Sequence, residues 1–230
     1  MDILPRFDST ALLESGVRQR WSSGAVLLHE GDESDHVLVI ESGRVKVSSS
    51  APSGKQVVLG IRGPGDLLGE LAAIDAEIRS ATVTAISPVT ATVVPGNAFR
   101  ALLISDGALT FDLLRTVVIR LREADKHRLD YGAYNVTERL ARRLLEYAQR
   151  YGHTEDDRVI IALSLTQTEL ADAANASREA VAKAFKHLRD IGAIRTARRR
   201  VELLRPELLV EIAEGSPNVY SDADTRHPRR

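Results

Sequence analysis

The fold is decided by the stretch Thr166-Gln-Thr-Glu-Leu-Ala-Asp-Ala-Ala-Asn-Ala-Ser-Arg-Glu-Ala-Val-Ala-Lys-Ala-Phe-Lys-His-Leu-Arg-Asp-Ile-Gly192. Thr166 and Glu169 have the three-residue spacing of a capping box, so a helix is expected to begin there. Asn175 tolerates the left-handed backbone that ends many helices. Ser177 can then cap a second helix, so the stretch predicts two short helices joined by a tight turn.

The second of these helices has one apolar and one polar side. Val181, Phe185 and Leu188 recur at helical spacing and predict a buried stripe. Polar side chains fall away from that stripe, at Arg178, Glu179, Lys183 and Lys186. The pattern predicts a helix-turn-helix whose second helix enters the DNA major groove. An ordinary helical hairpin with a solvated basic face is the alternative that this segment leaves open.

A basic hairpin is expected after the second helix. Residues 191–194 end the helix and enter an extended segment, residues 195–200 form a basic turn, and residues 201–204 form a second short strand. Such a wing would bring Arg198, Arg199 and Arg200 to DNA phosphates, with Thr166 and Thr168 as further contacts. A solvated charged loop is the alternative.

Composition narrows the class of protein. The chain has 230 residues, 43% hydrophobic and 27% charged, which is ordinary for a globular protein with room for two modest domains. The absence of cysteine excludes disulfides and thiolate chemistry within this chain. The sequence lacks a signal-peptide pattern, a membrane-length apolar run, metal-type histidine spacing, a nucleophile elbow and a P-loop. We therefore expect a cytoplasmic protein without a metal that is not an enzyme.

The net charge of −1 conceals an uneven distribution. Residues 1–110 contain 9 Lys/Arg and 13 Asp/Glu, a net charge of −4, whereas residues 137–206 contain 14 and 10, a net charge of +4. The basic block coincides with the predicted helix-turn-helix and wing. Binding to DNA phosphates requires positive charge in the DNA-binding segment, and this distribution provides it.

The N-terminal half predicts an antiparallel β barrel or jelly roll. Between Trp21 and Pro95, short β-branched runs alternate with turns that are rich in glycine, proline and aspartate. The runs lie at residues 25–28, 37–40, 45–47, 56–61, 81–86 and 89–94. The first fifteen or so residues of the chain are expected to form a short helix that packs outside this domain.

Residues 69–82 do not have a strand pattern and predict one helical turn between two strands. Gly69 permits close backbone approach, and the start of a helix offers free N–H groups to an anion. Arg79 can bind a phosphate through its guanidinium fork, Ser80 adds a hydroxyl, and Glu70 can accept from a sugar hydroxyl. An acid for ribose and a base for phosphate near one short helix indicate a nucleotide site.

A long helix is expected between the two domains, from about Phe111 to about Tyr131, where there is no Gly or Pro. Residues recur along it at alternating three- and four-residue steps, namely Leu114, Val117, Leu121, Ala124, Arg128 and Tyr131. This spacing predicts a coiled-coil seam and therefore a dimer. The alternative is a single amphipathic helix that packs on its own β domain.

Taken in order, these motifs resemble the cyclic-AMP receptor protein and fumarate–nitrate regulator (Crp/Fnr) superfamily of transcriptional regulators. The resemblance runs from about residue 20 to about residue 205. It rests on Glu30-Gly-Asp, Gly43-x-Val-Lys-Val, Gly65-Asp-Leu-Leu-Gly-Glu-Leu, Arg79-Ser-Ala-Thr and Ser177-Arg-Glu-Ala-Val-Ala-Lys.

The resemblance implies an α+β chain with four parts. These are a cyclic-nucleotide-binding jelly roll (1–110), a dimerisation helix and hinge (111–135), a winged helix-turn-helix (136–213) and a disordered tail (214–230). It also implies roles for individual residues. Glu70 would hold the ribose 2′-hydroxyl and Arg79 the cyclic phosphate, with help from Gly69, Leu71, Ser80 and Ala81. Arg178, Glu179 and Lys183 would read bases, and the lysine stands where the founding member has arginine, which loosens the expected base preference.

The chain departs from the family on the long helix. Cyclic-AMP-responsive members place a Thr-Ser pair there against adenine, and this sequence has Ala124-Asp125 instead. Adenine contacts would then come from Asp125, Lys126 or Arg128, or be absent. We expect a homodimeric DNA-binding regulator controlled by a cyclic nucleotide, with cAMP as the first candidate and RNA polymerase as a further partner. The alternatives are a ligand-independent regulator, in which Glu70 and Arg79 form only a structural ion pair, and a cyclic-nucleotide-binding subunit that does not bind DNA.

Overall fold

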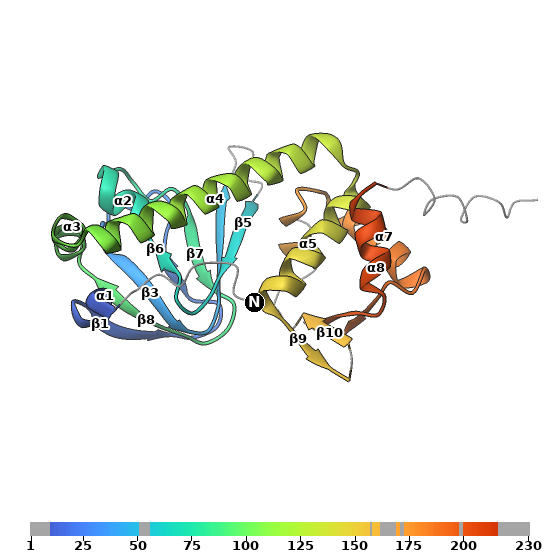
Figure 1. Cartoon of the computed structure of the whole chain (residues 1–230), viewed down its shortest axis with the longest axis horizontal. Coiled ribbons are helices and arrows are strands. Elements are labelled where there is room, and N and C mark those ends of the chain that lie inside the picture. The colour runs from blue at the N-terminus through green and yellow to red at the C-terminus, as the bar shows by residue number, and fades with distance from the viewer. Residues whose placement is uncertain are drawn as a thin grey trace, which may run out of the picture. The chain divides into compact units, whose positions relative to one another are not determined.

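A computed structural model describes residues 10–50, 56–156, 158–161, 169–170, 173–197 and 200–215. The chain divides into two units, Met1–Lys126 and His127–Arg230, each with its own core (Figure 1). Of the tail expected to be disordered (214–230), residues 216–230 lie outside the described part of the chain. No helix among the described residues is long and apolar enough to cross a membrane.

The described part of the first unit holds two four-stranded antiparallel sheets. One sheet has the strand order β1 (Val17–Trp21), β8 (Val89–Val94), β3 (Val37–Ser42), β6 (Leu67–Leu68). The other has the order β2 (Val26–Leu28), β7 (Thr82–Ala85), β4 (Val45–Ser50), β5 (Gln56–Arg62). These sheets confirm the predicted β jelly roll, whose strands can be followed in Figure 1.

Strand β3 explains how the unit builds its core. Its Leu38 and Ile40 point between the two sheets, whereas Val37 and Val39 point to the opposite face, toward the helices. Successive strand residues point to opposite sides, so a strand that is covered on both sides must be apolar throughout. The uninterrupted Val-Leu-Val-Ile run is therefore the consequence of double burial.

Helices cover the outer face of the β1-β8-β3-β6 sheet. They are α1 (Thr10–Glu14), α2 (Glu70–Asp75), α3 (Gly96–Ser105) and the beginning of α4 (Gly107–Ala133). Phe99 of α3 and Leu109 and Leu113 of α4 join the same core cluster as Val37. The long helix begins earlier than predicted, because Asp106 accepts hydrogen bonds from the backbone N–H groups of Ala108 and Leu109.

The second unit contains the end of α4, then α5 (Val136–Tyr151), α7 (Arg178–Asp190) and α8 (Pro206–Ala213). Its sheet has the order β11 (Ile194–Ala197), β12 (Arg200–Leu203), β10 (Arg158–Ile161), β9 (Gly152–Glu155). Helix α5 begins at a capping box in which Asn135 and Glu138 bond each other's backbone N–H groups. The predicted wing is the β11–β12 hairpin, and β10 extends it into the larger sheet.

Candidate functional site

Gly69 has a conformation that only glycine adopts easily. It precedes α2 with φ of 82°, in the left-handed region. A Cβ atom at this position would lie 2.7 Å from the Arg79 guanidinium and 3.0 Å from the His36 carbonyl oxygen. The glycine therefore lets the start of α2 approach Arg79 closely, as the sequence predicted for a nucleotide site.

Arg79 is buried, with only 2% of its surface exposed. Its Nε donates to Ser34 Oγ (3.0 Å), its Nη1 to the Gly69 carbonyl (2.8 Å) and its Nη2 to the His36 carbonyl (2.6 Å). Burial lowers the pKa of Arg79, and the negative charge of Asp35 opposes that effect. Three of the five guanidinium N–H groups thus donate to acceptors within the described part of the chain, and the other two have no acceptor there.

Glu70 is also buried, at 6% exposure, and its partner comes from the long helix. Arg120 Nη1 donates to Glu70 Oε1 over 2.7 Å, and Arg120 Nη2 donates to the Leu67 carbonyl over 2.7 Å. Asp66 lies 3.8 Å from the same guanidinium. Glu70 therefore forms its ion pair with Arg120. The sequence had offered a structural ion pair between Glu70 and Arg79 as an alternative, and the structure does not pair these two residues. No sequence spacing connects residue 70 with residue 120, so sequence reasoning missed Arg120.

The other predicted effector residues are more open. Leu71 on α2 and Ser80 beside Arg79 are exposed, and Ala81 is half-buried. Asp125 is exposed on α4 within the first unit, and Arg128 is exposed on α4 within the second unit. The structure thus gathers Glu70, Arg79 and Gly69 beside α2, and leaves Asp125 and Arg128, the residues of α4 predicted to contact adenine, in solvent.

The turn of the predicted helix pair has the expected backbone. Asn175 adopts a positive φ of 47°, and the Ser177 hydroxyl accepts a hydrogen bond from the backbone N–H of Ala180. These two local features end the first helix and begin α7, as the sequence predicted. Thr166 and Thr168 lie outside the described residues.

Helix α7 buries the stripe that its periodicity predicted, with Val181, Phe185 and Leu188 in the core of the second unit. Its opposite side is exposed and carries the four predicted DNA-contacting residues, Arg178, Glu179, Lys183 and Lys186. The pKa of Glu179 is lowered because its own backbone N–H and the Ser177 hydroxyl donate to the carboxylate. Glu179 is thus a charged hydrogen-bond acceptor at neutral pH, suited to a cytosine amino group.

The wing arginines that the structure describes are already engaged by carboxylates. Arg200 lies 3.1 Å from Glu155 Oε2 and 3.2 Å from Glu202 Oε1, and Arg195 lies 3.5 Å from Glu202 Oε2. Arg200 would have to share its charge between these acids and a phosphate. Arg198 and Arg199, also predicted to contact phosphate, lie outside the described residues.

The predicted seam of α4 is exposed at some of its positions. Leu114 and Leu121 are 57% and 60% exposed, and Ala124 and Arg128 also face solvent. Val117 differs, because it is half-buried and packs against the core of its own unit. Phe111 and Val118, which the sequence pattern had left out, complete an exposed apolar stripe with the two leucines.

Comparison with known families and proteins agrees with this arrangement. The family "Cyclic nucleotide-binding domain" matches residues 18–106, and the family "Crp-like helix-turn-helix domain" matches residues 138–212. The "CRP-like cAMP-activated global transcriptional regulator" of Mycobacterium tuberculosis is 34% identical over 190 residues, or 83% of this chain and 85% of that protein. The "Cyclic AMP receptor protein" of Thermus thermophilus is 28% identical over 86% of this chain and 88% of that protein.

Solved structures show the same fold. A transcriptional regulator of the CRP/FNR family from Thermus thermophilus superposes with a TM-score of 0.73 at 26% identity. The superposition covers 86% of this chain and 98% of that one. The chain thus shares both domains, their order and the long helix between them with this CRP/FNR-family regulator. The chain belongs to the Crp/Fnr superfamily of DNA-binding transcriptional regulators, with a cyclic-nucleotide-binding domain and a Crp-like helix-turn-helix.

Proposed function

We propose that the protein is a homodimeric, sequence-specific transcriptional regulator whose DNA binding is controlled by a cyclic nucleotide, with cAMP as the first candidate. The observation that carries this proposal is that two buried side chains of opposite charge, Glu70 and Arg79, both lie beside α2. Arg79 retains donors for a cyclic phosphate, and Glu70 lies at the start of the same helix to accept from a ribose hydroxyl. The cAMP-activated relative from Mycobacterium tuberculosis supports cAMP as the first ligand to test.

Arg120 connects this site to the long helix. Its guanidinium joins Glu70 on α2 and the Leu67 carbonyl on β6 to α4. A ribose hydroxyl that bonds Glu70 would share that carboxylate with Arg120 and so change how α4 is held. A ligand shifts the conformation only through its unequal affinity for two arrangements, and the contact between Glu70 and Arg120 is where that inequality would arise.

Isothermal titration calorimetry with cAMP and with cGMP tests the proposed control. We expect saturable heat with cAMP and weaker or no heat with cGMP. Absence of heat with either nucleotide at concentrations up to millimolar would instead support the alternative of a ligand-independent regulator. That alternative is favoured by the protein acceptors already bonded to Arg79 and by Ala124, which has no polar side-chain atom to bond adenine.

We further propose that the exposed apolar stripe of α4 is the dimer seam. Phe111, Leu114, Val118 and Leu121 follow steps of three and four residues, and all four are exposed. This is the spacing with which two helices pack side by side. A two-fold dimer would also present two copies of α7 to the two halves of an operator, and RNA polymerase is a further predicted partner of that assembly.

Leu121→Lys is expected to dissociate the dimer. It places two charges at the two-fold seam, and removal of a central contact costs about 2 kcal/mol or more at each copy. The total of about 4 kcal/mol should raise the dimer dissociation constant by about 1,000-fold. Sedimentation equilibrium measures this change. Ile104→Lys on α3 is the matched control, because Ile104 is 87% exposed and lies outside the stripe. Equal dissociation by both substitutions, or by neither, would argue against this seam.

A further inference from the structure

Strand pairing places a network of acids and bases on one face of the sheet in the DNA-binding unit. Arg195 on β11 lies directly opposite Glu202 on β12, and Ile160 on β10 lies opposite Glu202 on its other side. Side chains alternate along a strand, so residues two positions away from these share the same face. The ionisable residues on this face are Arg158, Arg195, Arg200, Glu155, Glu202 and His153.

Glu202 is the central carboxylate of this face, and its side chain is only 13% exposed. Arg200 Nε lies 3.2 Å from its Oε1, while Nη1 of Arg195 and of Arg158 lie 3.5 Å and 3.8 Å from its Oε2. One nearly buried acid thus holds three guanidinium groups close together. Because like charges repel, a second acid beside them is favourable, and Glu155 provides it.

Arg200 is drawn back from the loop of the wing. It is the first residue of β12 and pairs with Ala197 beside that loop. Its neighbour Val201 is level, across β10, with Gly152 at the start of β9, whereas Glu155 is at the other end of β9. Arg200 Nη2 nevertheless donates to Glu155 Oε2 over 3.1 Å. The side chain of Arg200 therefore runs diagonally across the sheet, toward the turn between β9 and β10.

Glu155 is an acceptor that another anion can replace. The turn that follows it contains Asp156 with φ of 49°, and it sets Glu155 opposite Arg158. The Glu155 side chain is 50% exposed, and His153 Nε2 lies 3.7 Å from its Oε2. Ion pairs between exposed groups are weak in water. A phosphate, which offers an arginine the same fork of two oxygens, can compete with this carboxylate.

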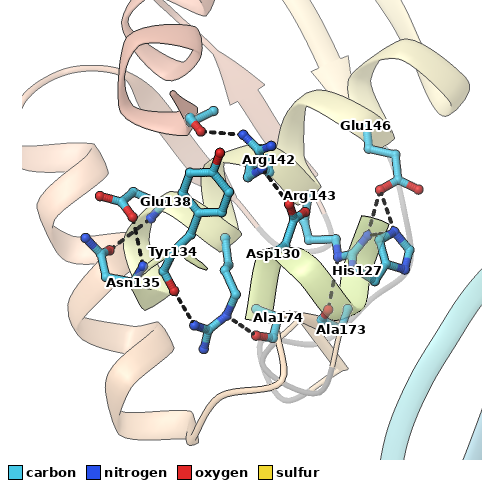
Figure 2. Close-up of polar contacts among 12 residues, drawn as sticks. His127, Asp130, Tyr134, Asn135, Glu138, Arg142, Arg143, Glu146, Ala173 and Ala174 are labelled. Carbon is cyan, nitrogen blue, oxygen red and sulfur yellow. Dashed lines mark hydrogen bonds and ion pairs between the residues drawn. The ribbon is translucent and has the colours of Figure 1, made fainter. Parts of the chain in front are cut away.

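The arginines of α5 are bound in a different manner. Arg142 Nε donates to the buried Asp130 Oδ1 over 3.0 Å. Arg143 Nε donates to the Ala173 carbonyl (3.1 Å, Figure 2). Removing the donor from a buried acid or from a backbone carbonyl is costly, so these arginines are part of the fold. Arg200, by contrast, has only carboxylate partners in the described part of the chain.

The wing also lies beside the DNA-reading helix. Arg189, exposed at the end of α7 one turn after Lys186, donates through Nη1 to Thr196 Oγ1 on β11 (3.4 Å). Thr196 is next to Ala197, where β11 reaches the wing loop. A duplex in contact with the exposed side of α7 therefore brings backbone phosphates near the loop from which Arg200 is drawn back.

We infer that Glu155 withholds Arg200 from DNA. In the free protein the guanidinium lies over the sheet, and on a duplex it leaves Glu155 for a backbone phosphate. Binding to unrelated DNA comes almost entirely from phosphate contacts, so an arginine engaged by an acid of its own chain contributes less to it. Glu155 is thus a positioning residue that lowers affinity for unrelated DNA. This inference uses the DNA binding of the family, and neither the proposed effector nor the proposed dimer seam.

Glu155→Gln tests the inference, because it removes the charge and keeps the size of an exposed side chain. Fluorescence anisotropy of the full-length protein with a random-sequence duplex, without effector, should show affinity that is about two- to fivefold higher. The dependence of log affinity on log salt should become steeper by about 0.9, which corresponds to one more phosphate contact. Unchanged affinity and an unchanged salt dependence would overturn the inference.

Glu211→Gln is the matched control. Glu211 is exposed on α8, in the same unit, and forms no ion pair among the described residues. The substitution changes the net charge by the same amount, so an equal gain in affinity would mean that net charge alone is responsible. In an Arg200→Ala background, Glu155→Gln should have no effect on duplex binding. Persistence of its effect there would also overturn the inference.

Nuclear magnetic resonance tests the contact in the absence of DNA. The Arg200 Nε–H signal, assigned by its loss in Arg200→Ala, should shift and exchange faster with water in Glu155→Gln, and should not change in Glu211→Gln. An unchanged signal in Glu155→Gln would overturn the inference even if the protein bound no random duplex. Neither measurement uses a nucleotide, so failure of the proposed effector control would leave this inference standing.

Discussion

Arg79→Leu is expected to abolish cyclic-nucleotide binding. Leucine removes the cation beside α2 and both of the guanidinium donors that remain for a phosphate. Hydrogen bonds to charged groups contribute about 1.5–3 kcal/mol each, so the loss of two such bonds should weaken binding by at least about 100-fold. Calorimetric titration of the variant with cAMP measures the loss.

The same substitution should also destabilise the β domain. Ser34 Oγ and the carbonyls of Gly69 and His36 each lose a hydrogen bond from the guanidinium, and the Gly69 carbonyl keeps its bond from the Ala73 N–H. Each lost bond to this cation costs about 1 kcal/mol, so the unfolding free energy should fall by about 2–3 kcal/mol. Thermal unfolding monitored by circular dichroism provides this measurement. Arg79→Leu therefore changes both the unfolding free energy and the affinity for cAMP, and a control variant is needed to separate the two effects.

Arg100→Leu is the control that separates them. Arg100 also donates to a carbonyl of α2, that of Ala73 (3.0 Å), but it is about half-exposed and pairs with Asp35. We expect this variant to lose some stability and to retain nucleotide affinity. Equal loss of affinity in both variants would mean that the β domain, rather than the Arg79 donors, is responsible, and the assignment of Arg79 would have to be withdrawn.

Arg178→Ala is expected to weaken specific DNA binding by about 10- to 100-fold, because a bidentate contact from arginine to guanine contributes about 1–3 kcal/mol of discrimination. Arg178 is exposed in the first turn of α7, and the buried stripe on the opposite side holds that helix in place. Binding to unrelated duplex should change much less, and nucleotide binding should not change. Fluorescence anisotropy with operator and random duplexes measures the ratio.

Lys186→Ala on the same helix provides the comparison. Lys186 is exposed two turns further along α7, where contact with the backbone of DNA is expected to be independent of sequence. Its loss should weaken operator and random duplex equally and reduce the salt dependence of binding by about one phosphate contact. If Arg178→Ala behaved in this manner as well, Arg178 would contact phosphate and would not read bases.

Local features of the sequence predicted much of this fold correctly. Asn175 and Ser177 mark the turn before α7 through backbone conformation and capping, which depend on neighbouring residues only. The stripe through Val181 and Phe185 follows from the helical period. Strands were recognised where glycine and proline separate β-branched runs. Strands β1 and β9 were missed because their exposed polar residues obscure the alternation of side chains. Strand β10 was missed because its apolar residues, 159–161, form a run too short for periodicity to separate a strand from a helix.

The sequence did not predict which side of the long helix α4 is buried. The spacing along α4 fits both Val117 and Val118, and only the packed structure places Val117 against its own core while Val118 remains exposed. Periodicity defines an apolar stripe but does not say which neighbour covers it. The same limit applies to Arg200, whose predicted phosphate contact now competes with Glu155 and Glu202.

The sequence by itself therefore determined the two domains, their order and the turn before α7, and it supplied the residues of the proposed effector site. Tertiary structure alone decided the partners of those residues. Arg120 reaches Glu70 across 50 positions, and Arg79 bonds Ser34 and His36 across 45 and 43. Caps and periodicity arise from neighbours within one or two turns, whereas these ion pairs and hydrogen bonds form only after separate strands and helices have packed together.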